Sequence, residues 1–144
     1  MTLLRTVLLC GLMLTLPAMA AERFDGVWKL RPGKSAGKMT QTMTIESVAA
    51  GTKVTTVIEF GNGTGMTMTY VTKFDGGEVP VYSAGKVVMT MRGKRTGPNS
   101  YEGSTSGAGG TSTFKTTISA DGKTMTTDST SGPNPGQSVF DRVK

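Results

Sequence analysis

The chain has 144 residues, a formal net charge of +6, one cysteine and no histidine. The absence of histidine excludes Ser-His-Asp and Cys-His catalysis, His-ligated zinc and an imidazole general base. The length suits one domain, and 36% hydrophobic with 18% charged residues is typical of a small folded protein. This composition argues against an enzyme, and we expect no cofactor.

The N-terminal segment has the pattern of a secretory signal peptide. Arg5 supplies a positive n-region, residues 7–16 form an apolar h-region, and Ala18-Met19-Ala20 is a small-x-small cleavage site. The apolar run is shorter than the roughly 18 residues that a membrane span needs. The sequence therefore predicts a signal peptide over 1–20, and a mature domain over 21–144 that is periplasmic or secreted and has no transmembrane segment.

The remainder of the chain is rich in β-branched residues, with 21 Thr, 11 Val and 3 Ile against one Leu. This excess disfavours helix and suits pleated strands. Apolar and polar residues alternate with period two between turn signals. The predicted strands cover 24–31, 39–45, 54–60, 66–74, 79–81, 87–92, 101–105, 113–119, 123–129 and 138–143. About nine or ten short strands at this spacing are typical of a sandwich or a closed barrel.

Several segments interrupt this alternation. The polar, Gly- and Pro-rich stretches 96–100, 107–110 and 131–137 are predicted to be surface loops. Pro80 lacks a backbone donor, so it predicts an edge strand or a bulge. The basic residues are scattered apart from Arg92, Lys94 and Arg95, which we interpret as a solvated strand face or edge guard. We therefore expect no nucleic-acid partner.

The two ends of the strand array resemble a known family. The segment Phe24–Leu30, FDGVWKL, is similar to the Gly-x-Trp motif that opens the first strand of lipocalins and their calycin relatives. Arg142 occupies the place of the basic residue that packs over that tryptophan. Segments 28–35, 75–81 and 119–126 also resemble exported bacterial lipocalin-like proteins.

This resemblance implies an all-β, antiparallel up-and-down barrel of about 8–10 strands. It also implies that Gly26, Trp28 and Arg142 close the barrel, with Arg142 in cation–π contact with the indole. The sequence departs from the family pattern in one respect, because mature lipocalins are usually longer and often carry a helix against the barrel. We find no such helix in this sequence.

Seven methionines lie beyond the predicted signal peptide, and two pairs of them are spaced i, i+2 on one strand face. Three interpretations stay open: core packing, a soft lining for an apolar guest, and thioether ligands for Cu(I). The candidate lining residues are Met43, Met68, Tyr70, Met89, Met91 and Phe114. Tyr70 would supply a polar group to the guest.

The sequence therefore predicts a monomeric, non-catalytic protein that binds a small hydrophobic or amphipathic molecule in a barrel. One alternative is a cell-envelope interaction protein with a filled core, working through a strand edge or the basic residues 92–95. A second alternative is a Cu(I)-binding protein that uses the methionine pairs.

Overall fold

The computed structural model describes residues 22–33, 39–131 and 135–144. The predicted signal peptide over 1–20 lies outside these residues. The described residues contain no helix, as expected, and therefore none with the length and apolarity that crossing a membrane demands.

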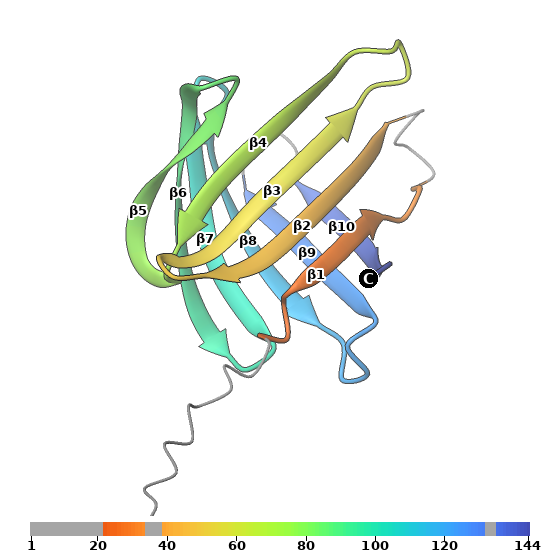
Figure 1. Ribbon diagram of the computed structural model, residues 1–144, viewed down its shortest axis with the longest axis vertical. Coiled ribbons are helices and arrows are strands. Elements are labelled where there is room, and N and C mark those ends of the chain that lie inside the picture. The colour runs from red at the N-terminus through yellow and green to blue at the C-terminus, as the bar shows by residue number, and fades with distance from the viewer. Residues whose placement is uncertain (1–21, 34–38, 132–134) are drawn as a thin grey trace, which may run out of the picture.

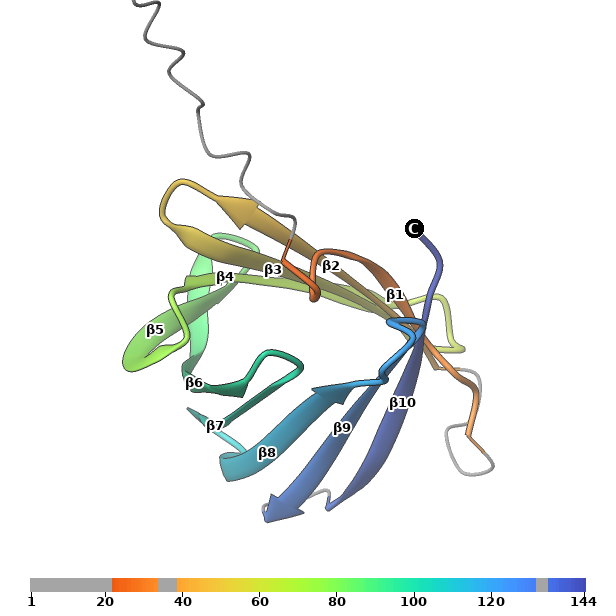
Figure 2. The ribbon, with the colours of Figure 1, turned by 90° about the horizontal axis from the view of Figure 1, so that it is seen from below.

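Ten antiparallel strands form one closed barrel, in which each strand pairs with its sequence neighbours and the first pairs with the last (Figure 1). Figure 2 shows the same strands arranged as a ring. The strands are β1 (Gly26–Leu30), β2 (Thr40–Val48), β3 (Gly51–Glu59), β4 (Gly65–Thr72), β5 (Asp75–Ser83), β6 (Lys86–Gly97), β7 (Ser100–Gly107), β8 (Gly110–Ile118), β9 (Thr124–Ser131) and β10 (Gly136–Arg142). The predicted all-β, antiparallel up-and-down barrel is confirmed.

The predicted loops are too long. Residues 96–97 belong to β6, residues 107 and 110 are paired ends of β7 and β8, and residues 136–137 belong to β10. These stretches lack an apolar face, but their backbones continue the ladders of their neighbours. Hydrogen-bond pairing, which needs no particular side chain, therefore extends the strands beyond the hydrophobic pattern.

Pro80 lies inside the nine-residue strand β5, so the predicted strand over 79–81 is too short. It pairs with Thr90 of β6, and the β5–β6 register shifts on both sides of it. On its other side β5 has one registered pair with β4, so Pro80 stands beside a nearly unpaired edge, which is where a residue without a backbone donor is tolerated.

The seam between β4 and β5 is the most weakly paired in the barrel. Thr69 and Tyr82 are its single registered pair, whereas β3 and β4 pair continuously over the length of β4. The barrel is closed, but the number of paired residues differs widely from one strand pair to the next.

The hydrophobic core lies toward one end of the barrel. We call this the closed end, and it contains the first residues of β1 and the segment 22–25 before it. Its buried residues are Phe24, Trp28, Ile45, Val54, Phe74, Tyr101, Ile118, Met125 and Phe140. The opposite end, which we call the open end, is formed by the β3–β4 and β5–β6 hairpins and the β7–β8 turn.

Candidate functional site

The closed end is sealed around Trp28. This side chain is fully buried, and its indole Nε1–H donates a hydrogen bond to the carbonyl of Phe24 at 2.9 Å. The guanidinium of Arg142 lies 4.1 Å from the centre of the indole ring. It also donates hydrogen bonds to the main-chain carbonyls of Arg23, Asp25 and Gly122. Arg142 therefore ties the N-terminal segment and the β8–β9 turn onto the last strand.

Gly26 belongs to the same arrangement. Its φ is +142°, and a Cβ at this position would lie 2.6 Å from Nη1 of Arg142 and 2.6 Å from the carbonyl oxygen of Lys144. A side chain would displace the guanidinium from the indole. The structure thus brings together the three residues to which the family resemblance assigned barrel closure.

Arg95 lies inside the closed end, which corrects its assignment to a basic surface face. Arg92 and Lys94 are exposed, but the Arg95 side chain is only 28% exposed and lies 4.7 Å from the ring centre of Phe24. Its guanidinium forms an ion pair with Glu22 at 2.9 Å. Successive residues on a strand point to opposite faces, so the three basic residues cannot share one surface. Period-two counting alone would have separated them.

Aromatic side chains form a floor between this end and the rest of the interior. The rings of Phe74 and Tyr101 are 4.5 Å apart, and Tyr101 also packs against Phe24 and Phe114 at 5.0 and 6.1 Å. Burial raises the pKa of Tyr101, an effect that a hydrogen bond with Thr116 and the charge of Arg95 oppose. The interior therefore ends at an uncharged aromatic surface.

Register places all six predicted lining residues on the inner face. Partners in a ladder point to the same side of a sheet. One inward row consists of Trp28, Met43, Thr56 and Met68, and its first and third members are buried. The same argument orients Tyr70 through Val54, Met89 through Val81 and Phe114 through its place beside the core.

Burial divides these six residues into two groups. Met91 is 1% exposed and belongs to the packed interior, because it lies deeper than Met89 on β6. The other five are partly exposed. An inward-facing side chain that still touches solvent indicates that solvent reaches part of the barrel interior.

Tyr70 presents a phenol group to this interior. Burial raises its pKa, with a smaller contribution from Tyr101, so the group is neutral at physiological pH. Its hydroxyl makes no hydrogen bond within the part of the chain that the structure describes. It is therefore a neutral donor and acceptor that a guest can engage.

Sequence reasoning missed several residues of the same face. Ladder pairing adds polar positions to the inner face: Gln41, Thr105, Ser112, Thr127 and Ser138. Many of these are Thr or Ser, which a hydrophobicity pattern scores as outward. Only the register identifies them.

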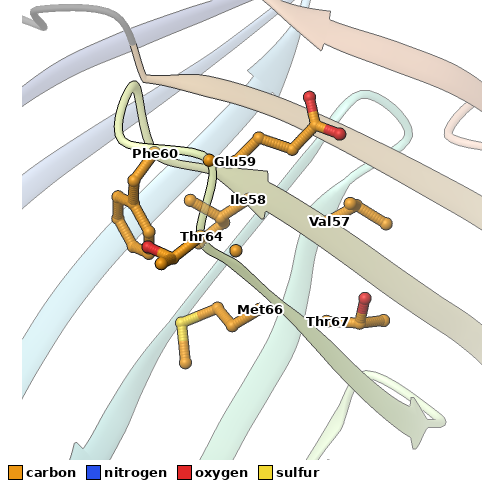
Figure 3. Close-up of a pocket in the computed structure, with 9 residues that line it drawn as sticks. Val57, Ile58, Glu59, Phe60, Thr64, Met66 and Thr67 are labelled. Atoms are coloured by element: carbon orange, nitrogen blue, oxygen red, sulfur yellow. The ribbon is translucent and has the colours of Figure 1, made fainter.

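Two hollows flank the mouth. One, of about 450 Å³, lies on the β3–β4 hairpin, where Figure 3 shows Ile58, Phe60 and Met66 among the lining side chains. Phe60 and Met66 are 41% and 38% exposed. The other, of about 310 Å³, lies at the β7–β8 turn and includes the inward-facing Met89 and Thr105. Apolar side chains therefore extend from the interior to the rim.

The described residues contain no cluster of three or more His, Cys, Asp or Glu side chains that could hold a metal ion. The methionine pairs Met66/Met68 and Met89/Met91 lie on β4 and β6, which β5 separates. Comparison of the chain with protein-family models, curated proteins and solved structures gives no match in any of the three.

Proposed function

We propose that this protein is an exported, lipocalin-like binding protein that holds a small apolar or amphipathic molecule, without catalysis, in the open half of its barrel. The observation that carries this proposal is the partial exposure of inward-facing Met43, Met68, Tyr70, Met89 and Phe114. A barrel built only for stability would bury such side chains, as the closed end does with Trp28.

The physical basis is the hydrophobic effect. A guest that displaces water from the apolar surface of a concave site gains binding free energy of about 25 cal/mol for each Å² of apolar surface that it buries. Methionine suits such a lining because its unbranched thioether adapts to guests of different shape. The N-terminal pattern over 1–20 supports export as the setting in which the guest is met.

The test begins with native mass spectrometry of the protein purified from its own compartment, which would reveal a retained lipid-sized guest. Titration with N-phenyl-1-naphthylamine, a neutral apolar fluorophore, and with Cu(I) under a competing chelator follows. We expect micromolar dye binding and no copper binding that survives the chelator. Copper retention without dye binding would favour the thioether alternative.

A pair of adjacent variants locates the site. Met68→Glu places a charge on the inner face, whereas Thr67→Glu places the same charge on the outer face of β4. We expect the first to weaken dye binding at least tenfold and the second to leave it unchanged. Equal effects of the two variants would contradict an interior site.

A second candidate is an envelope interaction protein. It is favoured by the apolar side chains that the outer face of neighbouring strands exposes: Val57, Val71, Tyr82 and Val88. Absence of both dye and copper binding at high protein concentration would leave this candidate in place of the first.

A further inference from the structure

We infer that the guest is electrically neutral along the part that enters the barrel, as in a long-chain alcohol, amide or ketone, and that it is not a fatty-acid carboxylate. This inference rests on the proposed function and specifies the ligand class of the same site. It is drawn from where the barrel places its charges.

Charged side chains are excluded from the inner face of the open half. Among the residues that the structure describes, no Asp, Glu, Lys or Arg occupies an inward position between the rim and the aromatic floor. On the strands of this half the charges alternate outward, as Glu59, Arg92 and Lys115 illustrate. An anionic headgroup inside the barrel would therefore meet no cation.

The two inward arginines are not available to a guest. Arg95 lies at the closed end, where it is paired with Glu22 and stacked on Phe24 and Phe74. Arg142 lies over Trp28 and donates to three main-chain carbonyls. Both guanidinium groups are occupied within the fold.

Neutral polar groups take the place of charges. The hydroxyl of Tyr70 is free of protein partners in the described chain, and Thr56, Thr105 and Ser112 face the same interior. A hydroxyl, amide or carbonyl of a guest can exchange hydrogen bonds with such groups. A carboxylate would lose its hydration and gain no ion pair, which disfavours binding.

The experiment compares guests of one chain length: 1-dodecanol, dodecanamide and dodecanoate, each displacing N-phenyl-1-naphthylamine from the full chain at pH 7.5. We expect the alcohol and the amide to bind at least tenfold more tightly than the carboxylate. Acidification that protonates the carboxylate should narrow the gap, because only the acid changes its charge.

Three variants sharpen the test. Met68→Lys supplies an inward cation and should improve dodecanoate binding relative to dodecanol at least tenfold, whereas Thr67→Lys, on the outer face, should not. Lys86→Gln removes the exposed lysine that begins β6 at the rim and should leave dodecanol binding unchanged.

The possible results separate the two proposals. Dodecanoate binding as tightly as dodecanol in the unaltered protein would overturn the neutral-guest inference while leaving a binding barrel in place. Loss of that tight carboxylate binding in Lys86→Gln would show that the rim holds an anionic headgroup. Failure of every probe to bind, the dye included, would overturn the proposed function and the inference together.

Discussion

Replacement of Trp28 by alanine should cost more stability than any other single truncation of the interior. A tryptophan buries about 150–250 Å², which at about 25 cal/mol per Å² corresponds to ~4–6 kcal/mol. The cation–π contact with Arg142 adds about 0.5–2 kcal/mol, and partial collapse of the cavity offsets part of the loss. We expect a decrease of about 4 kcal/mol, within the range of about 3–5 kcal/mol that such truncations produce.

The assay is urea unfolding followed by far-UV circular dichroism, because Trp28 is the only tryptophan and its fluorescence is lost in the variant. Tyr82→Ala is the matched control, since this aromatic side chain is 42% exposed on the outer face. A loss below about 1.5 kcal/mol, or one no larger than that of Tyr82→Ala, would refute the assignment of Trp28 to barrel closure. Dye affinity of the folded fraction should change less than stability does, because Trp28 is fully buried in the packed part of the barrel.

Three further predictions concern other parts of the barrel. Gly103→Ala would place a Cβ 1.9 Å from a main-chain carbonyl oxygen, and should lower the free energy of unfolding in urea by about 1–3 kcal/mol. Gly109→Ala, which has open space around it, should leave that free energy unchanged. The hydrogen bond from Arg31 holds the pKa of Asp141 below its ordinary 3.8. The stability that this pair contributes is therefore present above pH 3.8 and is lost as pH falls through the folded-state pKa of Asp141. Arg31→Gln should raise that pKa in an NMR titration, and an unchanged value would contradict the pairing. Burial raises the pKa of the Tyr70 phenol above the unfolded value of 10.0. The stability that this shift contributes is complete below about pH 10 and is lost as pH rises further, so Tyr70→Phe should flatten the fall of the urea midpoint above about pH 10.

The fold was predictable because its signals are local. Alternation in segments such as 66–74 identified nearly every strand, and the turn signals between these segments separated one strand from the next. Strand ends were less predictable, since Gly107 and Gly110 continue a ladder through backbone hydrogen bonds that no side-chain pattern records. Closure itself, through the pairing of β1 with β10, came from the family resemblance and not from periodicity.

The candidate site was predictable in part, for a related reason. Period-two alternation places methionines and aromatic residues on one face of a strand, so Met68, Met89 and Phe114 could be proposed as lining residues. The sequence did not indicate depth along the barrel axis, which places Met91 in the packed interior. Period two could have placed Arg95 on the opposite face from Arg92 and Lys94, but not its stacking on Phe24, because that contact joins segments distant in sequence.

Because β4 and β5 share a single registered pair, we expect the barrel to open between these two strands before it opens elsewhere. Backbone amides beside a single registered pair are protected by few cooperative neighbours, so they exchange with solvent through small openings while the other ladders remain intact. This weak pairing also leaves the first residues of β4, with the exposed Met66 among them, as a template for pairing between copies. Aggregation on heating should therefore begin at this strand and not at the end of the barrel that contains Trp28.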